Sequence, residues 1–172
     1  MKSWDVKISN VLKDVVIFTP SVHYDVRGEI FSTFRENVFN KYITNPFVED
    51  KISVSRKNVL RGLHGDSVTD KLVQCIEGDI YLVVVDWRKD SPTYKKWDSF
   101  VLNDKNRSQV LIPSGYLNGH LCLSDKCIFS YKQTSYYTGE HTQYSVSWDD
   151  ESLDIFWPIK NPILSKRDCN DK

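Results

Sequence analysis

The chain has 172 residues, and its 23 lysines and arginines balance 23 aspartates and glutamates. Zero net charge argues against a nucleic-acid or anionic-membrane surface, and no apolar run reaches the ~18 residues that a membrane span needs. The length predicts one domain, residues 1–172, which buries roughly two thirds of its unfolded surface without a metal or a disulfide.

Strand-forming residues dominate the composition. The chain contains 18 valines, 12 isoleucines, 8 threonines and 22 aromatic residues, but no alanine, the best helix former. This bias predicts an all-β protein. The polar start, Met1–Asn10, predicts no signal peptide.

The expected elements are short strands separated by turns, at the 8–12-residue spacing that is typical of a sandwich or barrel. A turn is expected at His23–Glu29, a short helix at Arg35–Ile43 and an irregular tail at Leu153–Lys172. Ile80–Trp87 is apolar almost throughout, which predicts burial on both faces. The other expected strands are Val15–Thr19, Ile30–Phe34, Lys51–Val54, Val59–Leu63, Lys71–Ile76, Lys96–Leu102, Gln109–Ile112, His120–Leu123, Lys126–Lys132 and Gln143–Trp148.

The four cysteines form no C-x-x-C pair, and two of them lie in apolar, strand-like sequence. A free cysteine in such surroundings behaves as a small hydrophobic residue. We therefore expect structural, reduced cysteines in a cytoplasmic protein. They are Cys75, Cys122, Cys127 and Cys169.

His64 stands out among the four histidines because it follows an apolar strand and lies next to a glycine. A glycine at such a site lets a ligand approach the backbone closely. His64 is therefore either a buried core histidine or a residue that carries chemistry. Arg61 would face the opposite side of a regular strand, unless Gly62 forms a bulge. His23 and His141 lie in polar, turn-like sequence and are expected on the surface.

The segment Pro113–His120 resembles half of the metal site of cupins, which are small jelly-roll barrels. Asn118 occupies the ligand position, and His120 comes two residues late. The other half would read His-x-His, whereas this chain has His64 followed by Gly65 and Asp66. A tight site needs three or four convergent ligands, so we expect no metal.

Tyrosines cluster at the end of a predicted strand, at Tyr131, Tyr136 and Tyr137. Such a cluster serves either packing, with a hydrated hydroxyl, or proton donation from a desolvated pocket.

Eleven short segments, taken in order over about residues 12–170, resemble the dTDP-4-dehydrorhamnose 3,5-epimerase family. They are Asp25–Gly28, Ser53–Ser55, Val59–His64, Lys71–Val73, Val85–Arg88, Ser91–Thr93, Ile112–Tyr116, Tyr131–Lys132, Trp148–Asp150, Trp157–Pro158 and Leu164–Asp168.

This resemblance implies a cupin-type jelly roll with short helical segments, and a homodimer that uses neither metal nor cofactor. The implied reaction is epimerisation beside the 4-keto group of a nucleotide sugar. His64 would be the base, oriented by Asp168, with Lys71 beside the enolate oxygen. Tyr131 would be the acid on the opposite face of the sugar.

Three further residues have implied binding roles. Tyr137 would line the same pocket, and Arg61 and Arg27 would contact phosphate or sugar. The N-terminal strands would pack across the dimer, so that Arg27 serves the partner's site.

The chain departs from the family pattern around the substrate. Glu49 and Lys51 replace the usual Gln and Asn, and Gly65-Asp66 replaces an aromatic residue and Gln. The usual motif Gly-Phe-Ala-His-Gly-Phe is replaced by Gly-Tyr-Leu-Asn-Gly-His at residues 115–120, so Asn118 stands at the histidine position. These departures resemble a branch that acts on GDP-linked 4-keto-6-deoxy-heptoses in capsule synthesis, at carbon 3 or at carbons 3 and 5. Gly65 is expected to leave room for a longer sugar tail, and Asp66 and Asn118 to contact its hydroxyls.

Three alternatives share this fold. A non-catalytic sugar-binding jelly roll would need no acid–base pair. A metal-dependent cupin would need the missing His-x-His. A cofactor-free 3,4-ketoisomerase of nucleotide sugars would share the enolisation and return the proton elsewhere. The resemblance to the family and to its GDP-heptose branch leaves two expected substrates, one GDP-linked and one dTDP-linked.

Overall fold

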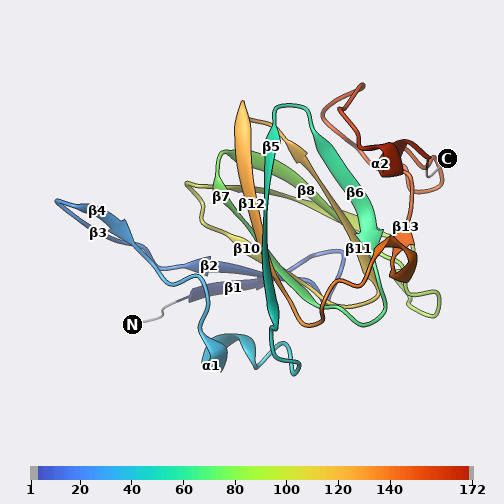
Figure 1. Ribbon diagram of the computed structural model, residues 1–172. Helices are drawn as coiled ribbons and strands as arrows, with labels where there is room; N and C mark the ends of the chain where they lie inside the picture. Colours follow the sequence, from blue (N-terminus) through green and yellow to red (C-terminus); the bar gives the residue numbers. More distant parts are fainter. Residues whose placement is uncertain (1–3, 171–172) are drawn as a thin grey trace.

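The structure is a computed structural model that describes residues 4–170; residues 1–3 of the polar N-terminal segment and 171–172 of the expected tail lie outside these. Two antiparallel sheets face each other (Figure 1). In spatial order, the six-stranded sheet contains β1 (Trp4–Ile8), β2 (Val16–Pro20), β10 (Gln109–Ile112), β7 (Lys71–Glu77), β12 (Lys126–Gln133) and β5 (Glu49–Arg56). The five-stranded sheet contains β13 (Tyr144–Ser145), β6 (Leu60–Gly65), β11 (Tyr116–Cys122), β8 (Asp79–Asp86) and β9 (Trp97–Asn103).

Helices are few and short: α1 (Glu36–Phe39), the 3-10 turn η1 (Glu140–Thr142) and α2 (Lys166–Asn170). The expected all-β class and jelly-roll fold are confirmed, because antiparallel strands in two facing sheets make up most of the described elements and the helices are short.

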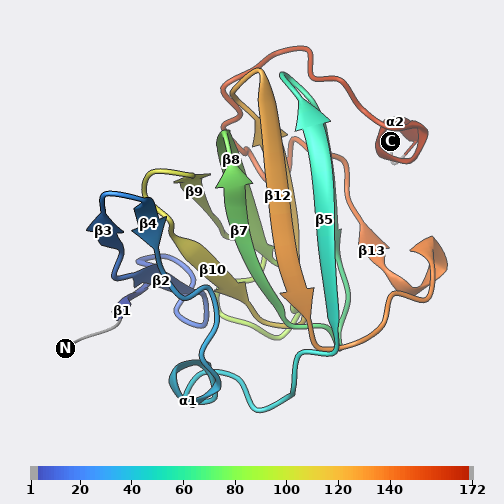
Figure 2. The same ribbon diagram turned by 60° about the vertical axis from the view of Figure 1, so that its left-hand side comes forward.

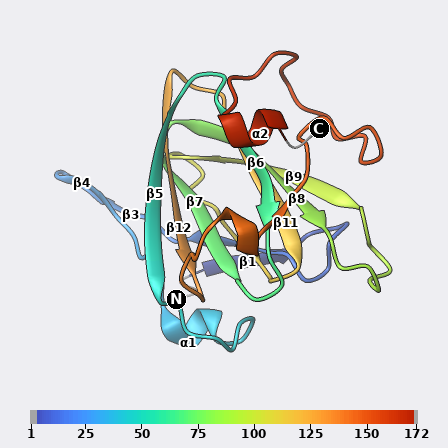
Figure 3. The ribbon, with the colours of Figure 1, turned by 45° about the vertical axis from the view of Figure 1, so that its right-hand side comes forward.

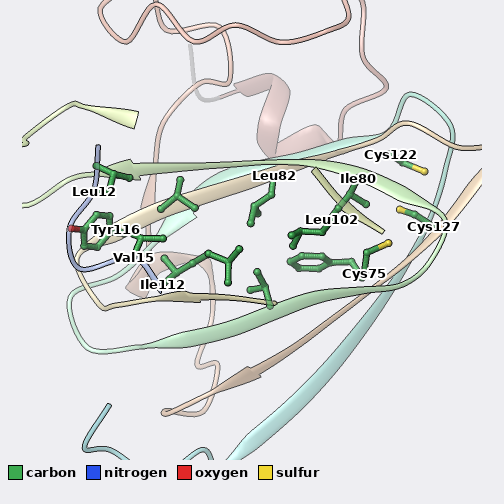
Figure 4. Close-up of a cluster of buried hydrophobic side chains, with 14 residues drawn as sticks. Leu12, Val15, Cys75, Ile80, Leu82, Leu102, Ile112, Tyr116, Cys122 and Cys127 are labelled. Carbon is green, nitrogen blue, oxygen red and sulfur yellow. The ribbon is translucent and has the colours of Figure 1, made fainter. Parts of the chain in front are cut away.

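Strand β8 shows why the two sheets stay together. Ile80, Leu82 and Val84 pack into the space between the sheets, whereas Val83 and Val85 join a second apolar cluster. Alternate residues of a strand point to opposite faces, so both faces of β8 are buried, as predicted. Figure 4 shows the inner cluster, with Leu82 and Leu102 across from Ile112.

The outer faces of the sheets are covered in different ways. The segment 146–164 packs over the five-stranded sheet through Leu153 and Trp157. The α1 region packs Phe39 and Ile43 against Trp4 of the six-stranded sheet. The view in Figure 2 shows β5 and β12 side by side beyond this cover. Ile52 and Val54 of β5 are exposed, so the outward face of the sheet is uncovered at this edge.

Two expected strands were wrong in extent, and one expected turn was incomplete. The turn at His23–Glu29 contains a hairpin of β3 (His23–Asp25) and β4 (Gly28–Ile30), and the strand expected over Ile30–Phe34 ends at Ile30 because Phe34 packs against α1 instead. The hairpin projects from the sheets (Figures 1 and 3).

The strand expected over Gln143–Trp148 is only the two-residue β13, because Val146 and Trp148 pack into the outer cluster. Sequence patterning missed β1, whose alternating Asp5 and Lys7 leave an edge strand with little apolar signal. The tail from residue 153 is irregular as expected, but α2 forms at its end.

Candidate active site

A cavity of about 550 Å³ opens between the two sheets. Five strands, the segment around η1, and α2 contribute its walls. The lining residues are Lys51, Ser53, Arg61, His64, Lys71, Val73, Asn118, His120, Phe129, Tyr131, Gln133, Tyr137, Glu140, Gln143, Ser165, Lys166, Arg167 and Asp168.

His64 and Asp168 meet in this cavity from distant parts of the sequence. His64 lies on β6, and α2 packs beside that strand (Figure 3). The imidazole Nε2 lies 2.8 Å from Asp168 Oδ1, and the Ser165 hydroxyl donates to Asp168 Oδ2 at 2.8 Å. Burial raises the pKa of Asp168, but contacts with His64 and Ser165, together with Arg167, outweigh it and hold the pKa below its usual value. Asp168 is therefore an ionised group that can orient an imidazole and stabilise its positive charge.

A bulge, which the sequence left open at Gly62, is present in β6. His64 lies opposite Asn118, and Arg61 lies opposite His120, so three steps along β6 match two steps along β11. This shift brings Arg61 to the same side as His64, and both line the cavity. A side chain at residue 62 would place its Cβ 2.5 Å from the Gly119 Cα, so only glycine fits between the two strands.

Lys71 is the buried cation of the cavity. Its Nζ donates to Asn118 Oδ1 at 3.1 Å, which links β7 to β11 across the gap. Burial lowers the pKa of Lys71 to about 8; Asp66 opposes this effect, and Lys51 and Arg167 add to it. A buried ammonium group can stabilise negative charge on a substrate oxygen more strongly than an exposed one.

Tyr131 faces His64 from the other sheet. It lies on β12, opposite Lys51 and Val73 of the neighbouring strands. Burial raises the pKa of Tyr131, Glu49 and Tyr137 raise it further, and Arg61 lowers it in part. The hydroxyl therefore stays protonated at neutral pH and can act as a proton donor.

Glu49 does not line the cavity itself, but it contacts three residues that do. Its carboxylate accepts from the Tyr137 backbone N–H at 3.2 Å and from the Gln133 amide, and it lies 3.2 Å from Lys51 Nζ. The Lys51 ammonium in turn lies 4.5 Å from the centre of the Tyr137 ring. Glu49, Lys51 and Tyr137 are thus brought together as one network.

The structure does not bring Asp66, Gly65 or Arg27 to the cavity wall. Asp66 accepts from the backbone N–H groups of Val68 and Thr69, at 2.9 and 2.6 Å, and so holds a turn. Arg27 lies at the exposed hairpin and pairs with Asp25.

The expectation that Gly65 makes room for a sugar tail was wrong. A Cβ at residue 65 would lie 2.0 Å from the Tyr116 carbonyl oxygen, so it would point into the β11 backbone. Gly65 lets two strands approach; it does not enlarge the cavity.

Sequence reasoning left several cavity residues without a role: Ser53, His120, Gln133, Glu140, Gln143, Ser165, Lys166 and Arg167. Arg167 and Ser165 stand within the quoted segment Leu164–Asp168, so their position beside Asp168 was the available signal. Arg167 donates to Ser145 and Gln143, which fixes its guanidinium on β13.

His23 and His141 are exposed, and Cys75, Cys122 and Cys127 are buried free thiols, as expected. Cys169 departs from the expected structural role, because it is a free thiol exposed on the surface. Within residues 4–170, no three side chains of the histidine, cysteine, aspartate or glutamate type form a group that could hold a metal. In the same range no helix is long and apolar enough to cross a membrane.

Comparison with known proteins gives consistent matches along nearly the whole chain. A family model described as dTDP-4-dehydrorhamnose 3,5-epimerase matches residues 9–172. The dTDP-4-dehydrorhamnose 3,5-epimerase of Shigella flexneri is 39% identical over 168 residues, covering 95% of this chain and 92% of that protein. The protein of the same name from Methanothermobacter thermautotrophicus is 40% identical over 171 residues, covering 96% and 92%.

Solved structures agree with the sequence matches. The Legionella pneumophila 3,5-epimerase in complex with dTDP-4-keto-L-rhamnose has a TM-score of 0.91 at 33% identity, covering 96% of this chain and 90% of that one. A 3'-monoepimerase from Streptomyces bikiniensis in complex with dTDP-quinovose has a TM-score of 0.88 at 28% identity, covering 95% and 85%.

The fold and these matches define an epimerase, an enzyme of the isomerase class. The chain belongs to the dTDP-4-dehydrorhamnose 3,5-epimerase family, as its sequence resemblance predicted.

Proposed function

We propose that the protein inverts carbon 3, alone or together with carbon 5, of a nucleoside-diphosphate 4-keto-6-deoxy sugar. One observation carries this proposal: an imidazole–carboxylate pair, a buried lysine and a tyrosine line one cavity, and the imidazole and the tyrosine come from opposite sheets. The family membership supports the same reaction.

The first step removes a proton from the carbon beside the ketone. That proton is acidic because the electron pair left behind delocalises onto the ketone oxygen as an enolate. His64 accepts the proton, and Asp168 stabilises the imidazolium that forms. Lys71 stabilises the enolate oxygen, and Asn118 holds the lysine in place.

The second step inverts the centre. If His64 returned its proton to the same face, the starting sugar would re-form. Tyr131 donates from the opposite sheet, so the new C–H bond forms on the other face of the ring, and the electron pair returns from the enolate oxygen to restore the ketone.

The cations at the cavity wall suit a diphosphate. Arg61, Lys51 and Arg167 line it; Glu49 pairs with Lys51, Asp168 pairs with His64, and Glu140 is a further lining carboxylate, on η1. Arginine forks match phosphate oxygens. The dTDP sugars bound by the relatives support a dTDP-linked substrate. The departures at Asn118 and Lys51 favour the second candidate, a GDP-linked 4-keto-6-deoxy-heptose of capsule synthesis.

The exposed hairpin supports a homodimer. Tyr24, Val26 and Ile30 of this hairpin are exposed by 72%, 104% and 71%, an apolar surface that solvent does not favour. Ile52 and Val54 are exposed on the edge strand β5. In the proposed dimer the hairpin packs on the second copy, and Arg27 reaches that copy's cavity. The buried free cysteines support a reducing, cytoplasmic compartment.

Deuterium exchange tests the reaction directly. The protein is incubated in deuterated water with dTDP-4-keto-6-deoxyglucose and, separately, with GDP-4-keto-6-deoxy-heptose, and NMR records which carbons exchange. We expect deuterium at carbon 3, or at carbons 3 and 5, in an inverted product. A product whose ketone has moved to carbon 3 would establish the 3,4-ketoisomerase instead, and no exchange with either sugar would refute the proposal. Comparing the two rates decides between the two substrates.

A further inference from the structure

The cavity contains a second histidine that the proposed reaction does not use. His120 on β11 lines the cavity and is only 4% exposed. Its Nε2 is buried and has no hydrogen-bond partner among residues 4–170. Burial lowers the pKa of His120 to about 3, and Arg61 adds to this effect, so the imidazole is neutral at physiological pH.

A second unpartnered polar atom lies close by in the fold. Ser53 on β5 also lines the cavity, and within the described part of the chain its hydroxyl has no hydrogen-bond partner. The two residues flank one aromatic ring: Phe129 on β12 lies opposite Ser53 and stacks on His120, with ring centroids 4.1 Å apart. Two hydrogen-bonding groups therefore border an apolar surface made by Phe129 and Val73.

Packing alone does not account for an imidazole at this position. Native proteins pair nearly all buried polar groups, and an unpaired one is costly. A phenylalanine would stack on Phe129 equally well, and it is the residue that the family pattern has at position 120. The chain instead places its histidine two residues along β11 from the usual position, which Asn118 now occupies. Residues two apart share a face of a strand, so both side chains still line the cavity.

The surroundings of His120 select a particular chemical group. Phe129 and Val73 suit an apolar stem, whereas the imidazole and the Ser53 hydroxyl suit a group that both donates and accepts hydrogen bonds. A methylene that ends in a hydroxyl combines these properties. The methyl group of a 6-deoxyhexose would leave the imidazole unpaired.

We propose that His120 is a specificity-determining residue that hydrogen-bonds a hydroxyl at the end of the sugar's exocyclic tail. This inference rests on the proposed function and assigns the sugar to a class longer than a 6-deoxyhexose. Discrimination of this kind is strong, because a sugar without the hydroxyl leaves a buried polar group unpaired.

The test uses two substrates that differ only by the terminal hydroxymethyl group: GDP-4-keto-6-deoxy-heptose and the GDP-4-keto-6-deoxyhexose of the same ring configuration. His120→Phe keeps the stacking and removes hydrogen bonding, whereas His120→Gln keeps hydrogen bonding. His141→Phe, at an exposed histidine, is the matched control. Initial rates give kcat and KM, and titration calorimetry in a His64→Asn background gives Kd without turnover.

We expect His120→Phe to raise KM and Kd for the heptose by about 10- to 100-fold. The kcat for the heptose, and KM and Kd for the hexose, should each stay within about twofold of the values for the unaltered protein. His120→Gln should recover most of the heptose affinity, and His141→Phe should match the unaltered protein. The thermal midpoint of His120→Phe should rise, because an unpaired polar group is removed.

Other results of this test would overturn either the role of His120 or the reaction on which it rests. Equal losses for both sugars, or no loss for either, would overturn the role of His120 and leave the epimerase reaction standing. No deuterium exchange into either GDP-linked sugar by the unaltered protein would overturn this inference. If dTDP-4-keto-6-deoxyglucose still exchanged, the proposed function would stand, and if that sugar failed as well, the proposed function would fall too.

Discussion

The two halves of the space between the sheets differ in character, although the same strands build both. Along β12, Cys127 belongs to the apolar cluster of Figure 4, Phe129 belongs both to that cluster and to the cavity wall, and Tyr131 and Gln133 line the cavity. Along β7, Cys75 belongs to that cluster, and Lys71 lies in the cavity. A few residues of strand thus separate close packing from an open site.

This difference shows in which part of the molecule the chain can bury polar and charged side chains. The apolar half fixes the distance between the sheets, so the other half keeps its shape without being filled. In that half burial lowers the pKa of Lys71 and raises the pKa of Tyr131. Stability and chemistry therefore depend on different parts of one barrel, and substitutions in each half should have separable effects.

The largest effect on activity is expected from a substitution in the open half, which is the half that contains the cavity. His64→Asn removes the proposed base, and we expect deuterium uptake beside the ketone to fall by about 10³- to 10⁴-fold while the unfolding midpoint stays close to that of the unaltered protein. NMR in deuterated water and urea unfolding measure the two quantities. Asp168→Asn should lose less, because water can replace part of its orienting role; near-normal uptake in His64→Asn would remove His64 from the mechanism.

The matching change in the closed half is Leu82→Ala. Leu82 is fully buried between the sheets, and truncation leaves a cavity that costs about 2–5 kcal/mol of unfolding free energy. We expect urea unfolding to report that loss, while kcat of the folded protein stays within about twofold. Val101→Ala, at a half-exposed position on β9, serves as the control and should cost less than about 0.5 kcal/mol. A collapse of kcat without loss of stability would contradict the separation.

Tyr131→Phe sharpens the comparison within the cavity. The substitution removes the donor hydroxyl and keeps the ring that packs beside Phe129. His64 can still take a proton and return it to the same face, so exchange at carbon 3 should persist while the inverted product forms roughly 100-fold more slowly. The two rates are read from one NMR time course. If exchange and inversion fall together, Tyr131 does more than donate on one side.

The smallest expected effect concerns pH. Lys71 has its pKa lowered from 10.5 to about 8, so it carries its charge below pH 8 and loses it as the pH rises past that value. Rising pH therefore removes the charge of Lys71, the proposed enolate-stabilising cation, and kcat/KM should fall about tenfold per pH unit above pH 8. Lys71→Arg keeps a charge at all accessible pH values, so this limb should disappear, whatever its absolute activity. An unchanged limb in that variant would assign the titration to another group.

The fold could be predicted because its strongest signals are local. The apolar run at Ile80–Trp87 and the hairpin at Gly78 specify β7 and β8 without distant information. The polar edge strand β1 and the exposed hairpin near Val26 have no such apolar run, so patterning missed them.

Part of the site could also be predicted. The glycines around His64 marked a strand where backbones approach, and the resemblance supplied Asp168 from the far end of the chain. The error at Gly65 has a physical reason: its neighbour is the Tyr116 carbonyl, 51 residues away, and a single sequence does not encode that contact. The unpaired state of His120 depends in the same way on what surrounds it in space.

The bulge in β6 matters for anyone who wishes to transplant this site into a designed scaffold. On an idealised strand, residues three apart face opposite ways, so copying the Arg61–His64 spacing would turn one of the two side chains outward. The graft needs the extra residue of β6 and a glycine at position 62, opposite a partner as slim as Gly119. The smallest unit that could be transferred is thus the pair of strands β6 and β11 with its bulge, and no shorter sequence motif would reproduce the site.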